Sequence, residues 1–113
     1  MLSEGDPGVT VVENHNLTLR CLVAVEKDAV HIPRLAWYHR DAELIEEGKR
    51  VTFEHTFLSN QGSEAEDGRN LHRFTVSLVN VAPHHDGVYE CRLLHRLNIS
   101  HSRAVFNVSV HCE

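Results

Sequence analysis

The stretch DGVYEC, residues 86–91, places a tyrosine two positions before a cysteine and directly after an Asp-Gly pair. An Asp-Gly pair favours a tight turn, because Gly87 tolerates backbone angles that other residues resist. Side chains alternate along a strand, so Tyr89 and Cys91 point to the same face. The stretch therefore predicts a turn that leads into a strand with a buried tyrosine and a buried cysteine.

The length and composition of the chain indicate a single folded domain. Its 113 residues are enough for one core, and a hydrophobic content of 42% excludes wholesale disorder. Eleven Lys and Arg against 16 Asp and Glu give a net charge of −5, which argues against a nucleic-acid partner because such partners favour a basic face. No apolar run is long enough to cross a membrane, and the polar stretch MLSEGDPG cannot be the apolar region of a signal peptide. We therefore expect any signal or membrane anchor to lie outside this chain.

Alternation of apolar and polar residues predicts strands along almost the whole chain. In residues 17–23, Leu, Leu, Cys and Val share one face, while Thr18 and Arg20 take the other, which is the period of a half-buried strand. Similar patterns occupy residues 9–12, 34–40, 50–58, 71–81, 87–94 and 104–110. Strands separated by short polar turns are typical of a sandwich or a barrel. For residues 41–47 an amphipathic helix remains an alternative.

The same alternation assigns inward and outward faces to the other strands. In residues 34–40, Leu35 and Trp37 point inward, and Tyr38 and Arg40 point outward. The remaining inward residues lie on two later strands: Phe74, Val76 and Leu78, and then Ala104, Phe106, Val108 and Val110.

Cys21 on the second strand, Trp37, the phrase NVAPHHDGVYEC and Cys91 together resemble the immunoglobulin superfamily, with its Cys…Trp…Cys frame and tyrosine corner. The resemblance covers residues 9–110. It implies an all-β, antiparallel sandwich of two sheets, with one domain over residues 1–113, a core at about 8–110 and a linker that starts at 111–113. It also implies a Cys21–Cys91 disulfide, packing of Trp37 against that bridge, and a bond from the Tyr89 hydroxyl to the backbone at the corner. We expect these four residues to be structural.

The two cysteines are 70 positions apart, which resembles the longer variable-type (V-set) layout, and the chain is similar to V-set-and-transmembrane cell-surface proteins. Residues 50–58 are either the extra edge strand C″ or strand D followed by a long D–E loop. The acidic run SNQGSEAEDGRN at 59–70 has no strand pattern and favours the loop.

Two features depart from the family pattern. The aspartate that the family often has six residues before the second cysteine is His85 here, with Asp86 one place later, so the usual ion pair is either missing or rebuilt. The last strand lacks a Gly-x-Gly bulge, which argues against pairing of the antigen-receptor kind.

Three sequons indicate the secretory route: Asn16-Leu17-Thr18, Asn98-Ile99-Ser100 and Asn107-Val108-Ser109. Asn16 and Asn107 have outward parity, and Asn98 lies in a predicted loop. Glycosylation and a structural disulfide both require that route, so we expect an extracellular protein, either a plasma-membrane ectodomain or a secreted one. Cys112 is left over, which predicts an interchain disulfide or a partner elsewhere in a longer protein.

Metal, cofactor and enzyme functions are not expected. The ten histidines show no ligand spacing such as His-Glu-x-x-His, and the adjacent His84 and His85 are expected in a solvated turn, although a pH-responsive surface remains open. The chain has no Gly-rich phosphate loop, no Gly-x-Ser-x-Gly elbow and no free cysteine with an obvious base.

Two classes of function remain. The first is a recognition module of a cell-surface receptor or adhesion protein, which binds a protein counter-receptor or a homophilic partner. The second is a scaffolding immunoglobulin repeat of intracellular filaments, in which the cysteines stay reduced; a secreted, non-anchored binding protein is a further alternative. The sequons, the cysteine spacing and Cys112 favour the first.

The resemblance also implies where a partner binds, because V-set domains use the exposed front sheet and the loops at one end. Tyr and Arg often dominate interfaces. In the alternative, the B–C loop residues tuck under their own loop and Tyr38 covers the edge of the core. The expected contact residues are Tyr38, Arg40, Glu90, Arg92, Leu94 and Val105 on the front sheet, Arg96 and Leu97 in the F–G turn, and Val30 and Ile32 in the B–C loop.

Overall fold

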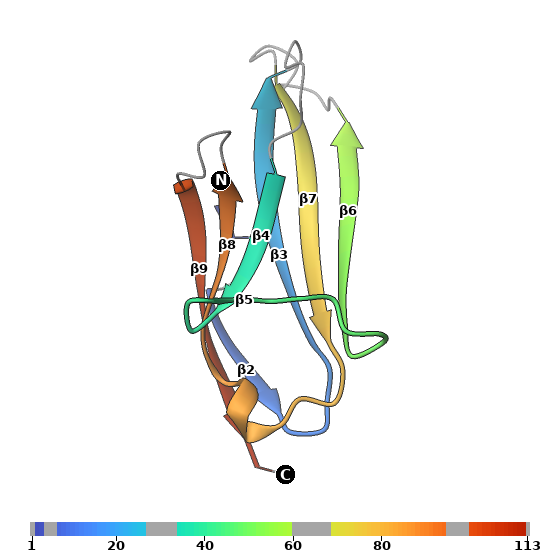
Figure 1. Ribbon diagram of the computed structural model, residues 1–113, viewed down its shortest axis with the longest axis vertical. Helices are drawn as coiled ribbons and strands as arrows, with labels where there is room; N and C mark the ends of the chain where they lie inside the picture. Colours follow the sequence, from blue (N-terminus) through green and yellow to red (C-terminus); the bar gives the residue numbers. More distant parts are fainter. Residues whose placement is uncertain (1, 4–6, 27–33, 60–68, 95–99, 113) are drawn as a thin grey trace.

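A computed structural model describes residues 2–3, 7–26, 34–59, 69–94 and 100–112, and it shows a sandwich of two sheets (Figure 1). The elements are β1 (Leu2–Ser3), β2 (Gly8–Val12), β3 (Leu17–Glu26), β4 (Arg34–His39), β5 (Ala42–Glu43), β6 (Val51–Ser59), β7 (Arg69–Leu78), the 3₁₀ helix η2 (Pro83–His85), β8 (Gly87–Leu94) and β9 (Ser100–His111). The prediction of an all-β sandwich is confirmed. The helical alternative for residues 41–47 is wrong, because this segment forms a turn and β5. In the described part of the chain, no helix has the length and hydrophobicity needed to cross a membrane.

The back sheet has four strands in the order β1-β3-β7-β6, and the front sheet has five in the order β2-β9-β8-β4-β5. Neighbouring strands are antiparallel with one exception among the described residues, since β2 runs parallel to β9 from Gly8↔Asn107 to Val12↔His111. The prediction of an antiparallel sandwich needs this correction. The start of the chain pairs first with β3 through β1 and then crosses to the front sheet as β2, whose direction is therefore set by the crossing.

Strand β6 settles the alternative that the sequence left open. It pairs with β7 from Val51↔Leu78 to Ser59↔Leu71, so it is strand D of the back sheet and not the extra strand C″ of the front sheet. The connection at residues 60–68, the expected D–E loop, lies outside the described residues. Among the described residues, the front sheet gains only the two-residue β5 beyond β4. The two long strands β6 and β7 both lie between the cysteines and contribute to their wide spacing.

The core lies between the sheets and confirms the predicted disulfide. Cys21 on β3 and Cys91 on β8 are bonded and fully buried, so the bridge joins the two sheets. Trp37 lies opposite Cys91 in the register of β4 and β8, and its ring centroid is 5.8 Å from that of Phe106. A bridge with a sequence separation of 70 removes about 4 kcal/mol of unfolded-state chain entropy. The expected inward residues are buried or half-buried.

The tyrosine corner forms as predicted. The Tyr89 hydroxyl donates a hydrogen bond to the carbonyl oxygen of His85, and burial raises the pKa of Tyr89 to about 12. The His39 ring stacks on Tyr89 with centroids 4.2 Å apart. Asp86 Oδ1 lies 2.9 Å from Arg40 Nη2, so the ion pair of the family pattern is rebuilt here with an aspartate one position later in the sequence. Gly87 has φ +123°, a left-handed conformation that side chains rarely adopt.

Candidate functional site

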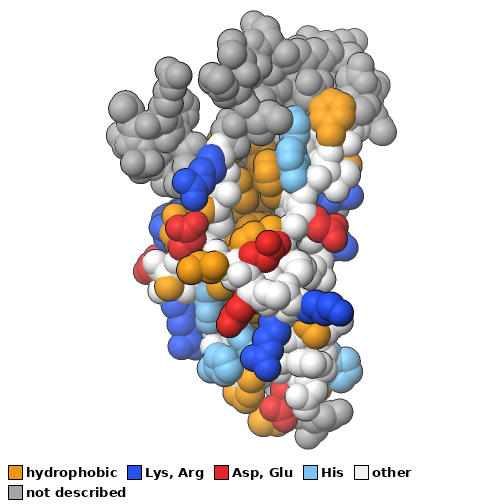
Figure 2. Space-filling model, turned by 45° about the vertical axis from the view of Figure 1, so that its right-hand side comes forward, with side chains coloured by type: hydrophobic (Ala, Val, Ile, Leu, Met, Phe, Trp, Pro, Cys, Tyr) orange, Lys and Arg blue, Asp and Glu red, His pale blue; other side chains and the backbone are white. Residues whose placement is uncertain are grey.

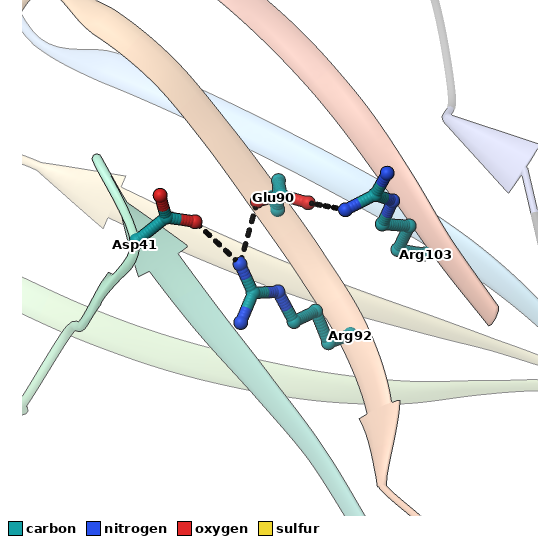
Figure 3. A network of polar contacts seen from close by, with 4 residues as sticks. All are labelled: Asp41, Glu90, Arg92 and Arg103. Carbon is teal, nitrogen blue, oxygen red and sulfur yellow. Dashed lines mark hydrogen bonds and ion pairs between the residues drawn. The ribbon is translucent and has the colours of Figure 1, made fainter. Parts of the chain in front are cut away.

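The outward face of the front sheet carries a network of charged side chains from three segments of the chain (Figure 3). Glu90 and Arg92 lie two residues apart on β8, so alternation places both on the outer face. Arg103 comes from the adjacent β9, where it pairs with Arg92 in register. Asp41 comes from the turn between β4 and β5 and has a left-handed φ of 66°.

Glu90 is the centre of this network. Its side chain is only 8% exposed, and each carboxylate oxygen has an arginine partner: Arg92 Nη2 lies 2.7 Å from Oε1, and Arg103 Nη1 lies 3.1 Å from Oε2. A buried carboxylate is costly unless it is paired and hydrogen-bonded. The two arginines therefore hold a charge that this position could not otherwise bury.

Arg92 links the carboxylates to an aromatic ring. The same Nη2 lies 2.8 Å from Asp41 Oδ1, and the guanidinium carbon lies 4.0 Å from the centroid of the Tyr38 ring, a cation–π distance. The hydrogen bond that Arg92 donates to Glu90 is the main reason that the pKa of Arg92 lies above its ordinary value. Arg92 thus remains charged and is held from three sides.

Around the network, the face mixes exposed charge with exposed apolar groups. The Asp41 and Arg103 side chains are 86% and 63% exposed, so one acidic and one basic group reach solvent on the two sides of Glu90. Val88 and Val105 are both exposed on the same face. An open depression of about 310 Å³ is lined by Arg40, Asp41, Val88, Glu90, Arg103 and Val105.

The structure brings together only part of the expected contact surface. Tyr38 and Arg92 are half-buried against each other, and Val105 is exposed on β9. Glu90 has the predicted outward parity, but the expectation that it is available to solvent is wrong, because Arg92 and Arg103 cover it.

Arg40 is exposed and lines the depression, so its role in partner contact stays a prediction, but it does not lie on a strand. It lies in the turn after β4, with φ 52°, and its guanidinium pairs with Asp86. The strand ends at His39, so the alternation no longer applies to Arg40. The side chain of Leu94 and the residues Arg96, Leu97, Val30 and Ile32 lie outside the described residues.

The sequence analysis missed Arg103 and Asp41. Arg103 shares the outward parity of Val105 on β9, a signal that could have identified it. Asp41 had no such signal, because its position depends on the conformation of the β4–β5 turn.

Two of the three sequon asparagines are described, and both are exposed. Asn16 lies just before β3, and its Oδ1 accepts a hydrogen bond from the backbone N–H of Asn80 at 3.3 Å. Asn107 lies on β9, on the same outward side as Arg103 and Val105. Asn98 lies outside the described residues. Cys112 is an exposed free thiol.

The histidines differ from the expectation in two ways. His84 is exposed, but His85 is half-buried, and its Nδ1 accepts a hydrogen bond from the backbone N–H of Ala82 at 2.7 Å. A His55–His72 pair between β6 and β7 was not foreseen, with Nε2 and Nδ1 2.8 Å apart. Within the described segments, no group of three or more His, Cys, Asp and Glu could hold a metal ion.

Comparison with solved structures shows the same fold at low sequence identity. The complex of Dpr2 Ig1-Ig2 with DIP-Theta Ig1-Ig3 has a TM-score of 0.65 and 18% identity, and the match covers 98% of this chain and 48% of that chain. The complex of titin M10 with the obscurin-like 1 immunoglobulin domain has a TM-score of 0.64 and 21% identity, with coverage of 94% and 87%. Titin domains z1z2 in complex with telethonin have a TM-score of 0.63 and 12% identity, with coverage of 94% and 44%. The chain thus spans less than half of two of these neighbours.

Sequence comparison assigns the family. No curated protein matches the chain. A family model of the immunoglobulin V-set domain matches residues 4–111, a range that includes the disulfide, Trp37 and the tyrosine corner. The chain belongs to the immunoglobulin V-set domain family.

Proposed function

We propose that this domain is an extracellular recognition module of a cell-surface receptor or adhesion protein, and that it binds a protein partner through the outward face of β4, β8 and β9. The observation that carries the proposal is Glu90, a carboxylate buried between two arginines on the outer face of a sheet. Buried ion pairs contribute little net stability compared with apolar packing, so stability alone is a weak reason for such a network. Its effect is to fix the positions of Arg92 and Arg103 before a partner arrives, which lowers the entropy lost on binding.

The composition of the face supports this use. Arg and Tyr are enriched at interface hot spots, and Tyr38 packs under Arg92. Exposed Val88 and Val105 add apolar area beside the charges. Asp41 and Arg103 present opposite charges on the two sides of Glu90. A partner with a basic and an acidic group at the matching positions would therefore be favoured, and it would bind in one orientation.

The sequons support the extracellular part of the proposal and narrow the contact surface. We propose that Asn16, Asn98 and Asn107 carry glycans in the secreted protein. A glycan on Asn107 would cover the β9 side of the face and direct the partner toward β4 and β8. The connection from β2 to β3, which contains Asn16, lies at the end of the sandwich where the described chain ends (Figure 1). Cys112, exposed beside that end, is the candidate for an interchain disulfide.

Similar structures support both this proposal and its alternative. Dpr2 and titin M10 are each recorded in complex with another immunoglobulin protein, as expected for recognition by such domains. The titin neighbours also support the second candidate, an intracellular scaffolding repeat. A non-reducing mass measurement on protein from a secretory host separates the two candidates. Recognition outside the cell predicts an intact Cys21–Cys91 bridge and added glycan, whereas free thiols and no glycan would support the scaffold.

The front face is tested by binding of the secreted domain to a panel of cell-surface ectodomains. Arg103→Ala removes an exposed arginine from the front sheet, and Arg20→Ala removes an exposed arginine from the back sheet as the matched control. We expect Arg103→Ala to weaken binding about tenfold or more, the usual size of a hot-spot loss, and Arg20→Ala to leave it unchanged. Loss of binding only in the Arg20 variant would place the interface on the back sheet.

A further inference from the structure

Strand β6 is an edge of the back sheet, with β7 as its only partner strand among the described residues (Figure 1). The Val51 N–H donates to the Glu47 carbonyl oxygen at 3.4 Å, and the Phe53 N–H points to Glu46 Oε2, also at 3.4 Å. Both bonds lie on the side away from β7. Backbone groups alternate in direction along an antiparallel strand, so those of His55 and Phe57 also face away from β7.

This edge lacks most of the devices that protect free edges. Exposed edges are usually blocked by Lys, Pro, a bulge or a covering segment. The sequence VTFEHTFLS contains neither Lys nor Pro. Glu47 covers the edge at Val51, and an irregularity in the pairing lies between Phe57 and Ser59. Between them, the exposed Glu46 side chain covers only the Phe53 N–H, and no other strand of the described residues pairs with the outward backbone groups of His55 and Phe57, which are left as a template for another strand.

The side chains of this stretch that point toward the front sheet border an apolar opening. Phe53 and Phe57 are 37% and 54% exposed, and Ile45, in the segment that leads to β6, is 78% exposed. Figure 2 shows hydrophobic side chains at the bottom of a hollow between the two sheets. The opening holds about 160 Å³ and is lined by Leu35, Trp37, Leu44, Phe53, His55 and Phe74. Gathered exposed apolar groups of this kind mark interaction sites.

We propose that two copies of this chain pair through their β6 edges, antiparallel and with His55 opposite His55 on the two-fold axis. Phe53 then lies opposite Phe57 of the second copy, and each such pair exchanges backbone hydrogen bonds because both residues direct their N–H and C=O outward. The second copy replaces the exposed Glu46 carboxylate as the partner of the Phe53 N–H. The two back sheets become one continuous sheet across an isologous interface. Phe57 of the second copy lies beside Phe53, at the mouth of the opening.

The sequence of β6 is self-complementary, because Phe53 and Phe57 lie symmetrically about His55, and its charge pattern favours this register over its neighbours. About His55, the sequence reads Phe-Glu-His-Thr-Phe, so Glu54 lies opposite Thr56 and the aromatic pairs are the same on both sides of the axis. A slide of two residues one way places Glu54 opposite Glu54, and like charges directly opposite are destabilising. A slide the other way places Phe53 opposite Ser59 and loses the aromatic pairs. The self-complementary arrangement therefore has one best register.

The proposal does not depend on the front-face function, and sedimentation equilibrium of the glycosylated, secreted domain over a range of concentrations tests it. Thr56 is exposed, so charges can be placed there without touching the core. We expect a monomer–dimer equilibrium. Thr56→Glu should weaken dimerisation about fivefold, because the new carboxylate lies opposite Glu54 of the second copy at two symmetric positions. Thr56→Lys should strengthen dimerisation by about the same factor, because opposite charges then face each other. Phe57→Pro removes an outward N–H but no bond to β7, so it should abolish the dimer while the domain stays folded by circular dichroism.

Three outcomes would overturn the proposal. One is a wild-type domain that stays monomeric into the millimolar range. Another is a dimer that responds equally to Thr56→Glu and Thr56→Lys, which would exclude this register. The third is a dimer that survives Phe57→Pro but is lost in Arg103→Ala, which would place self-association on the front face.

Discussion

The outer face of the front sheet and the β6 edge offer a partner two different kinds of surface. On the front face, polar groups meet one another: Glu90 has an arginine on each oxygen, and Arg92 is held by Asp41 and Tyr38. On the β6 edge, the outward backbone groups of His55 and Phe57 have no partner strand among the described residues, and apolar side chains border a hollow. A surface whose charges are already paired binds a partner through charges that are held in fixed positions. An open sheet edge instead binds a strand of the partner by forming backbone hydrogen bonds with it.

The largest expected difference between the two regions is in the free energy of unfolding. Glu90→Ala removes a buried carboxylate and leaves Arg92, which is only 20% exposed, with Asp41 as its remaining carboxylate partner. We expect a loss of about 2 kcal/mol in urea denaturation. Glu54→Ala on exposed β6 is the matched control and should cost less than about 0.5 kcal/mol. Equal losses of unfolding free energy in the two variants would mean that the Glu90 network stabilises the domain no more than an exposed surface residue does.

Some features of the two regions could be predicted from the sequence, and others could not. Alternation identified the core faces of β3, β7 and β9, because a strand buried on one side repeats every two residues. It does not extend to Arg40, because the strand ends at His39 and Arg40 and Asp41 are both left-handed.

Burial of Glu90 and pairing of His55 with His72 were beyond sequence reasoning for another reason. Each depends on the register between two strands, β8 with β9 and β6 with β7. A single strand pattern does not contain that register.

An intermediate effect is expected on the β6 side as pH falls. His72 is buried, and burial followed by the charge of nearby His55 lowers its pKa below the ordinary value of 6.5. The unfolded chain therefore binds the proton more readily than the folded one, so stability should decline as pH falls below about 6.5. His55 on β6 and the rings of Phe57 and Phe74 are the groups that face His72 among the described residues.

Thermal unfolding at pH 7.5 and at pH 5.5 measures this decline. His72→Gln keeps a polar group beside His55 but does not titrate, so it should flatten the pH dependence. Some slope should remain, because burial also lowers the pKa of His85 at the tyrosine corner. An unchanged slope in His72→Gln would assign the whole effect to other groups.

The smallest effect is expected where the front sheet has an ion pair without burial. Arg40 and Asp86 lie 2.9 Å apart, but their side chains are 61% and 43% exposed, so water screens the pair. Arg40→Ala should therefore cost about 0.5 kcal/mol in urea denaturation, well below the loss in Glu90→Ala. A Glu90→Ala, Arg40→Ala double variant should show additive losses, because the Arg40 pair and the Glu90 network share no partner atom. If Arg40→Ala instead lost as much stability as Glu90→Ala, the Arg40–Asp86 ion pair would be the main electrostatic support of the tyrosine corner. The pair would then have a structural role despite its exposure, even though Asp86 lies one position later than the aspartate of the family pattern.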